Sequence, residues 1–289
     1  METPIASYTA TRELLRTYDL RVKKHLGQNF LTDHFVLNKI IAAADVALTD
    51  LVIEIGPGLG ALTQALLPLA GRLVAVELDI DLAQALGQTL AGYQNLIILN
   101  RDALHCDWAA IAQDLGYSSF KAVANLPYYI TTPLIMSLLE GGAPLTSLTV
   151  MIQKEVAARI LAKPATQDYG ALTLGVAYRA KASLVANVPR NCFVPRPNVD
   201  SAVIHLDIYQ TPPVQVSDQA LLFSIIKAAF SQRRKTLVNC INNANTLSLT
   251  KEAVEHALTS CNLPKDIRGE TLSLSQFAKI TNALIFQRS

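Results

Sequence analysis

From residue 50 onward, short apolar runs alternate with segments in which apolar residues recur at helical spacing. The runs predict strands at Leu51–Ile55, Arg72–Glu77, Asn95–Asn100, Lys121–Ala124 and Leu148–Ile152. The segments between and after them predict helices at Ala61–Ala70, Asp79–Ala91, Asp107–Leu115, Pro133–Leu139 and Lys154–Ala162. Strands that alternate with helices build a mostly parallel sheet, and continuously apolar strands are typical of a sheet covered on both faces. We therefore expect a doubly wound α/β fold.

After Pro164 this rhythm changes. Ser201–Tyr209 predicts a further strand that follows a loop rich in proline, whereas Leu172–Ala180 and Ala182–Val188 fit either helix or strand. Beyond a linker at Gln210–Val216, helical spacing predicts helices at Gln219–Phe230, Lys235–Asn243, Lys251–Cys261 and Gln276–Phe286. We place a domain boundary near residue 213, which predicts an α/β domain over 1–212 and a smaller all-helical domain over 213–289.

Composition narrows the class of protein further. The chain has 289 residues, of which 51% are hydrophobic, and this excludes a disordered chain. No apolar run reaches the ~18 residues of a membrane span, and the N-terminus lacks the apolar region of a secretory signal. The four cysteines form no C-x-x-C motif, and neither they nor the histidines show metal-ligand spacing. We expect a cytoplasmic protein with reduced thiols, no membrane segment and no metal.

Charge is spread unevenly along the chain, although the total is only +2. Residues 1–30 carry +2, residues 31–212 carry −4, and residues 213–289 carry +4. The two ends of the chain are therefore basic, and the part between them is mildly acidic. This distribution is compatible with a polyanionic partner bound by the ends, but it does not show that there is one.

The first chemical motif is the glycine-rich sequence Glu54-Ile55-Gly56-Pro57-Gly58-Leu59-Gly60, which follows a predicted strand and precedes a predicted helix. Glycines there permit a tight turn and close approach of a ligand to the backbone. The spacing departs from the dinucleotide fingerprint, and Pro57 removes an N–H that could hold a pyrophosphate. An ordinary turn has the same composition, but a cofactor without phosphates, such as S-adenosylmethionine (SAM), fits the motif better.

Acidic residues stand at or just after the ends of the next two predicted strands. Glu77 ends the second strand, where a carboxylate can accept hydrogen bonds from both ribose hydroxyls. Asp102 follows the third strand and can accept a hydrogen bond from an adenine amino group. Either residue alone is better explained as a solvated acid at a strand end. Because parallel strands end at one edge of the sheet, the two acids and the glycine loop together predict a nucleoside site there.

The fourth strand ends in Asn125-Leu126-Pro127-Tyr128, the most specific motif in the chain. An aromatic amine is a poor nucleophile because its lone pair is delocalised into the ring. The Asn125 side-chain oxygen and the Leu126 carbonyl, oriented by Pro127, can accept both amine hydrogens and so free that lone pair. Tyr128 offers a flat face on which a base can stack. The alternative is an Asn-Pro turn with two core tyrosines, Tyr128 and Tyr129.

Together these motifs resemble the ribosomal RNA adenine N6,N6-dimethyltransferases, with the small-subunit enzymes of bacteria as the nearest branch. The resemblance covers about residues 11–289 and includes Lys24–Leu31, Asn191–Ser201 and Phe230–Leu237 in the family's order. It implies a Rossmann-like SAM-dependent methyltransferase core with a seven-stranded sheet. It also implies dimethylation of two adjacent adenosines in the 3′ hairpin loop of 16S rRNA, on an immature 30S subunit, by a monomer.

The resemblance also assigns residues. It places Asn29, Leu31, Gly56, Gly58, Glu77, Asp102 and Asn125 around SAM, and it adds Phe193 to Tyr128 as the aromatic pair that sandwiches the target adenine. Taken alone, Phe193 is more typical of a core residue, because it lies in an apolar stretch. The basic residues of the two ends become candidate RNA phosphate contacts: Arg21, Lys23, Lys24, Arg233, Arg234 and Lys235.

Three other functions remain open at this point. A large-subunit rRNA adenine methyltransferase of the macrolide-resistance type shares the core, but its motif usually reads Asn-Ile-Pro-Tyr, whereas position 126 here is Leu. A small-molecule methyltransferase accounts for the glycine loop but not for Asn125–Tyr128 or the basic helical domain. A non-catalytic ribosome assembly factor would have no need of the intact set of site residues.

Overall fold

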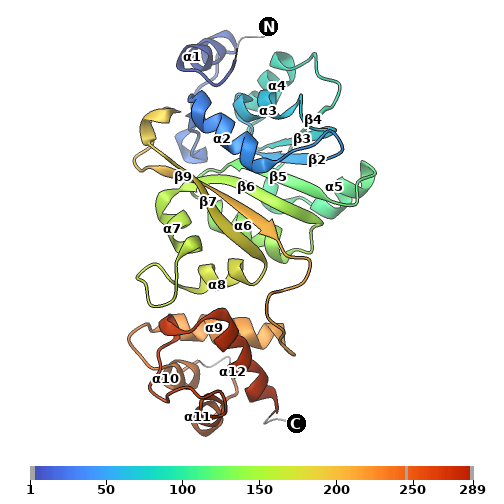
Figure 1. Ribbon diagram of the computed structural model, residues 1–289. Coiled ribbons are helices and arrows are strands. Elements are labelled where there is room, and N and C mark those ends of the chain that lie inside the picture. The colour runs from blue at the N-terminus through green and yellow to red at the C-terminus, as the bar shows by residue number, and fades with distance from the viewer. Residues whose placement is uncertain (1–3, 245–246, 287–289) are drawn as a thin grey trace. The chain divides into compact units, whose positions relative to one another are not determined.

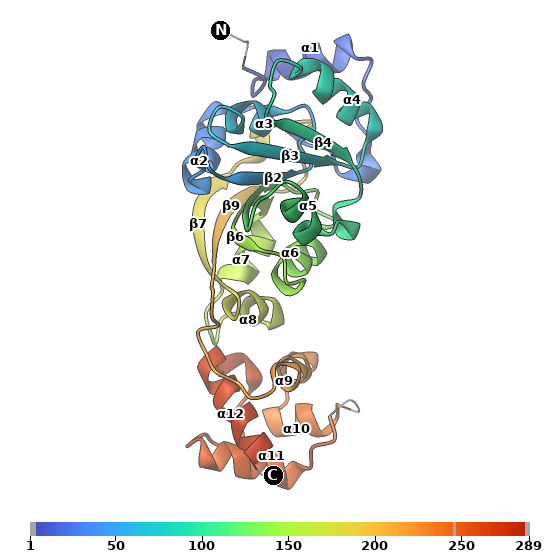
Figure 2. The same ribbon diagram turned by 90° about the vertical axis from the view of Figure 1, so that its right-hand side faces the viewer.

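The computed structural model describes residues 4–244 and 247–286, with the backbone alone at residue 24. The chain forms two compact units (Figures 1 and 2). The larger unit contains the residues up to Ala157 together with Ala182–Ile208, and the smaller contains Ala158–Lys181 and the residues from Tyr209 onward.

The larger unit is built on a seven-stranded sheet with the order β4-β3-β2-β5-β6-β9-β7. The strands are β2 (Leu51–Ile55), β3 (Arg72–Glu77), β4 (Leu96–Asn100), β5 (Phe120–Asn125), β6 (Leu145–Gln153), β7 (Ala180–Val188) and β9 (Ser201–Ile208). Neighbours from β4 to β6 are parallel, and β9 runs antiparallel to β6. This confirms the expected mostly parallel α/β sheet. The strand order reverses between β2 and β5, which is where sheets of this kind bind ligands.

Helices cover both faces of this sheet. Figure 2 shows α2 (His34–Ala44), α3 (Ala61–Leu66) and α4 (Ile80–Thr89) on one side, with α5 (Trp108–Asp114) and α6 (Thr131–Glu140) on the other. All five residues of β2 are buried, as a strand covered on both faces requires. Aspartates accept backbone N–H bonds at the starts of several helices, namely Asp33 before α2, Asp79 before α4 and Asp107 before α5.

Sequence periodicity missed the N-terminal part of this unit. Helix α1 (Tyr8–Thr17) precedes a two-residue strand, β1 (Phe30–Leu31), which pairs antiparallel with β8 (Phe193–Val194). Strands this short carry no measurable alternation of apolar and polar residues, so local patterning cannot reveal them. Their pairing fixes the segment before α2 against the loop that precedes β9.

The smaller unit is helical but is not the contiguous 213–289 segment that the sequence predicts. Its helices are α8 (Ala171–Ala177), α9 (Gln219–Ser231), α10 (Leu237–Asn242), α11 (Lys251–Ser260) and α12 (Leu274–Phe286), and α7 (Lys154–Leu161) begins in the larger unit. Residues 158–181 join it because their side chains pack with the C-terminal helices: the Tyr169 hydroxyl donates a 2.7 Å bond to the Leu272 carbonyl, and Arg179 lies 4.4 Å from the Phe223 ring centroid. Within the described residues, no helix is both long and apolar enough to cross a membrane.

Candidate active site

A cavity of about 160 Å³ lies at the carboxyl ends of the parallel strands, where the sheet order reverses. It brings together most of the residues that the sequence predicts for the cofactor and the target amine. Those that line it are Asn29, Leu31, Gly56, Gly58, Glu77, Asp102, Asn125, Leu126, Pro127 and Tyr128. Their convergence from segments nearly 100 residues apart places the predicted site in a single hollow.

The glycine loop between β2 and α3 depends on left-handed backbone. Gly56, Gly58 and Gly60 have φ values of 70°, 59° and 92°, which side chains other than glycine rarely adopt. A Cβ at Gly58 would stand 3.1 Å from a ring carbon of Phe30, and one at Gly56 would stand 3.7 Å from the Asn125 carbonyl oxygen. The loop therefore holds its backbone close to both neighbouring walls of the cavity.

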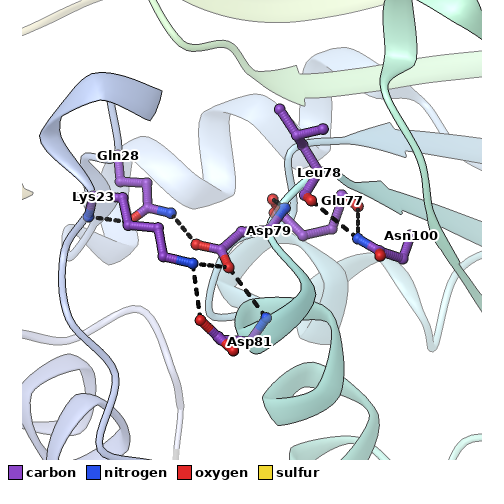
Figure 3. Close-up of polar contacts among 7 residues, drawn as sticks. All are labelled: Lys23, Gln28, Glu77, Leu78, Asp79, Asp81 and Asn100. Carbon is purple, nitrogen blue, oxygen red and sulfur yellow. Dashed lines mark hydrogen bonds and ion pairs between the residues drawn. The ribbon is translucent and has the colours of Figure 1, made fainter.

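Glu77 at the end of β3 is 7% exposed, and backbone donors hold both of its carboxylate oxygens. Its Oε2 accepts from the Gly58 N–H at 3.1 Å, and its Oε1 accepts from the Asp79 N–H at 2.9 Å. Asn100 supports the same turn by donating to the carbonyls of Glu77 and Leu78 (Figure 3). Burial raises the pKa of Glu77 despite these hydrogen bonds. The arrangement presents an oriented acid to the cavity.

Asp102 follows β4 and is partly exposed. In the strand order β4-β3-β2-β5, β4 and the Asn125 strand β5 lie on opposite sides of β2, which precedes the glycine loop. Its Oδ1 accepts a 2.9 Å bond from the Leu104 N–H, and His105 Nδ1 lies 3.3 Å from its Oδ2. These local contacts fix the turn after β4 and hold the carboxylate at the cavity wall.

Asn125 at the end of β5 is oriented from the N-terminal segment. Its Nδ2 donates a 3.0 Å bond to the Asn29 carbonyl, and the Asn29 side chain donates to the Gly27 carbonyl at 2.9 Å. The Leu126 N–H donates to the Met151 carbonyl at 3.1 Å, which anchors the following residue to β6. Because Nδ2 is engaged, Oδ1 is the part of the Asn125 amide that remains to accept from a ligand.

The two predicted aromatic residues have different positions. Tyr128 lines the cavity, and its hydroxyl lies 2.9 Å from Ser201 Oγ. Phe193, which pairs with Leu31 across β1 and β8, is not among the residues that line the cavity: it is 4% exposed and belongs to the hydrophobic core. That Phe193 contacts the target base stays a prediction. Tyr129, 54% exposed, lines the cavity and was not among the predicted residues.

Not all of the predicted phosphate contacts are available. Lys23 Nζ pairs with Asp79 at 2.6 Å and with Asp81 at 2.8 Å. Arg233 pairs with Glu270 at 3.3 Å and donates to the Gln167 carbonyl at 2.6 Å. The side chain of Lys24 lies outside the described part of the chain. Within that part, the predicted contacts that are exposed and make no ion pair are Arg21, Arg234 and Lys235.

One buried acid lies beside the site without a role predicted for it. Glu54 in β2 is completely buried, and neither of its carboxylate oxygens has a hydrogen-bond partner within the described residues. Burial and, to a smaller extent, the negative charge of Glu77 raise the pKa of Glu54 to about 8. The side chain is therefore mostly neutral at pH 7.

The fold and the cavity define a Rossmann-like methyltransferase. The doubly wound sheet carries a glycine loop after β2, where the strand order reverses. The buried acid Glu77 ends β3, and the oriented Asn125 ends β5. The chain belongs to the ribosomal RNA adenine dimethylase family, whose model matches residues 19–284.

Individual relatives agree with this membership. A protein of Lachnoclostridium phytofermentans named ribosomal RNA small subunit methyltransferase A is 50% identical, with 95% of each chain covered. The crystal structure of a dimethyladenosine transferase from Plasmodium falciparum has a TM-score of 0.74 at 27% identity and covers 89% of this chain and 97% of that one. The 23S rRNA methyltransferase ErmE has a TM-score of 0.69 at 25% identity, with 89% and 99% covered.

Proposed function

We propose that this protein uses SAM to dimethylate N6 of two adjacent adenosines in the 3′ hairpin loop of 16S rRNA during small-subunit assembly in the cytoplasm. The observation that carries the proposal is the cavity that joins Glu77 and the glycine loop to Asn125 and Tyr128. The relatives named small subunit methyltransferase support the choice of ribosomal subunit, since one is identical at half of the aligned positions.

The cavity residues fit SAM. When bound, SAM supplies a methyl group activated by its sulfonium charge. The Glu77 carboxylate would accept from the ribose hydroxyls, and Asp102 would accept from the adenine amino group. Gly56 and Gly58 keep the loop free of side chains where the cofactor must approach the backbone. Asn29 and Leu31 would close the site from the N-terminal segment.

The target amine would lie against Asn125 and Leu126. The Asn125 Oδ1 and the Leu126 carbonyl would each accept one amine hydrogen, which favours a pyramidal nitrogen with an available lone pair. Tyr128, held by Ser201, would stack on the extruded base. A general base is not required, because the methylated nitrogen is acidic enough to lose its proton to water. The chain then contributes mainly positioning and exclusion of water.

The RNA contacts proposed for this chain are reduced to Arg21, Arg234 and Lys235, the predicted basic residues whose side chains are exposed without an ion pair in the described part of the chain. Exposed cations of this kind bind phosphates without reading sequence. The adenosines themselves would be selected by the cavity, since loop bases can be splayed out of their stacks.

The decisive experiment mixes the purified monomeric protein with each ribosomal subunit in turn. Both subunits come from a strain that lacks this modification. With labelled SAM, we expect up to four methyl groups per small subunit, and primer extension should stop at two adjacent adenosines of the 3′ hairpin. Methylation of 23S rRNA instead would assign the protein to the macrolide-resistance type. Binding to the small subunit without any methyl transfer would make it a non-catalytic assembly factor.

A further inference from the structure

The N-terminal segment forms one wall of the cavity. Residues from Leu26 to Leu31 all line it, although α2 separates them in sequence from the glycine loop that forms another part of the lining. Lys23 lies just before this wall and does not line the cavity. Its ammonium group instead reaches the acids that begin α4, which follows the strand that carries Glu77.

Asp79 is the residue on which this wall is anchored (Figure 3). Its Oδ1 accepts from Lys23 Nζ at 2.6 Å, and its Oδ2 accepts from Gln28 Nε2 at 2.8 Å. The Gln28 Oε1 in turn accepts from the Lys23 backbone N–H at 2.7 Å, which closes a ring of contacts. Both carboxylate oxygens of one residue therefore bind the N-terminal segment.

Asp79 also supports the cofactor side of the cavity. Its backbone N–H donates to Glu77 Oε1 at 2.9 Å, and its Oδ1 accepts from the Asp81 N–H at 3.1 Å at the start of α4. The Asp79 side chain is only 2% exposed, so its charge depends on these partners. Burial raises the pKa of Asp79, but the hydrogen bonds from Lys23 and Gln28 outweigh it and hold the pKa below its ordinary value.

We propose that Lys23 and Asp79 are positioning residues whose ion pair latches the segment 22–31 onto the cavity and so sets how long SAM remains bound. The proposal rests on the proposed use of SAM. If the wall is already ordered in the free protein, binding SAM costs no free energy for ordering it. If the wall also opens in the free protein, the apparent affinity for SAM equals that of the closed protein multiplied by the fraction of molecules that are closed. Opening would also release the cofactor, so the latch acts chiefly on the dissociation rate.

This assigns to Lys23 a role different from the phosphate contact that the sequence predicts. If Lys23 served RNA, its replacement would weaken RNA binding and leave SAM binding unchanged. The latch makes the opposite prediction, because both acids that hold Lys23 belong to the cofactor side of the unit. Arg21, exposed and two residues earlier, stays a proposed phosphate contact.

The test compares Lys23→Met, Lys23→Arg and Arg16→Met in the full chain. Arg16 is an exposed cation of α1, so its variant removes the same charge from the N-terminal region without touching Asp79. SAM affinity is measured by calorimetry, and the dissociation rate by chase with S-adenosylhomocysteine. Thermal unfolding verifies that each variant folds, and hydrogen exchange follows residues 22–31.

For Lys23→Met we expect SAM to dissociate about 10-fold faster, with faster exchange over 22–31, whereas Arg16→Met matches the wild type and Lys23→Arg recovers most of the loss. In the wild type the dissociation rate should rise with ionic strength, and this dependence should be weaker in Lys23→Met. An unchanged SAM dissociation rate, or RNA binding weakened instead, overturns the latch. A wild-type protein that does not bind SAM would contradict the proposed function itself.

Discussion

The side chain of Asn125 donates a 3.0 Å hydrogen bond to the backbone carbonyl of Asn29, across 96 positions of sequence. The residue proposed to accept the target amine is thus oriented by the wall proposed to close over the cofactor. If the proposed roles hold, this contact joins the wall beside the cofactor to the orientation of the Asn125 oxygen.

Replacing Asn125 with Ala removes one of the two acceptors proposed for the target amine. We expect the methylation rate to fall by about 100-fold or more, the scale for loss of a preorganised polar contact in an active site. SAM binding should remain measurable by calorimetry, since Glu77 and the glycine loop are intact. A variant that dimethylates rRNA at the normal rate would show that Asn125 does not have this role.

Glu77→Ala should weaken SAM binding by roughly 1.5–3 kcal/mol, the range for hydrogen bonds to charged groups. Acidification should also weaken SAM binding, because it protonates the Glu77 carboxylate. Since burial raises the pKa of Glu77, this weakening should begin at a higher pH than it would for a glutamate with an ordinary pKa. Calorimetry across pH measures both effects. Affinity that does not change in Glu77→Ala would refute the ribose assignment.

Gly58→Ala tests the left-handed turn of the glycine loop. A Cβ there combines a φ of 59° with a 3.1 Å approach to Phe30, and we expect a loss of about 1–2 kcal/mol of unfolding free energy. SAM affinity should fall too, because the Gly58 N–H orients Glu77. Gly92→Ala is the matched control, since a Cβ there meets nothing within 4 Å. Equal effects in both variants would contradict the role of the turn.

Glu54→Gln tests the buried carboxyl beneath the loop. The pKa of Glu54 is raised to about 8 in the folded protein, whereas the ordinary pKa of 4.5 applies to the unfolded chain. Between these two pH values the folded protein keeps a proton on Glu54 that the unfolded chain releases. Stability from this group is full below pH 4.5 and falls by up to about 1.4 kcal/mol per pH unit until pH 8. Urea unfolding should show this fall in the wild type, and Gln should remove it. An identical pH profile in both proteins would contradict the assignment.

Arg234→Ala combined with Lys235→Ala should flatten the salt dependence of RNA binding. Loss of two phosphate contacts on a single strand should reduce the slope of log K against log salt by about 1.4. Arg233→Ala should instead lower the thermal stability of the protein, since Arg233 joins Glu270 and the Gln167 carbonyl. If the double variant keeps the wild-type slope, these residues belong to a solvated surface.

Local patterning was sufficient for the parts of this protein in which neighbours in sequence determine the structure. Buried strands are continuous apolar runs, so β2 and β3 were predicted at their observed bounds, while α3 ends four residues before its predicted end at Ala70. The glycine loop and Asp102 follow strands, Glu77 and Asn125 end them, and parallel strands bring such positions to one edge of the sheet. Strand ends and turns therefore account for the residues that the glycine loop, Glu77, Asp102 and Asn125 contribute to the cavity, and other parts of its lining come from segments without such a signal.

Partner choice across the chain was decided only by the tertiary structure. Lys23 has no local signal that distinguishes an ion pair with Asp79 from a phosphate contact, because the acid lies 56 positions away. Phe193 is buried by pairing with a two-residue strand, and Tyr169 and Arg179 pack with helices that follow a predicted boundary. By itself, the sequence determined where strands and turns place chemical groups, since backbone periodicity and glycine conformations are local. Which charges neutralise one another, and which aromatic residues face the cavity, depended on long-range packing, which local spacing does not encode.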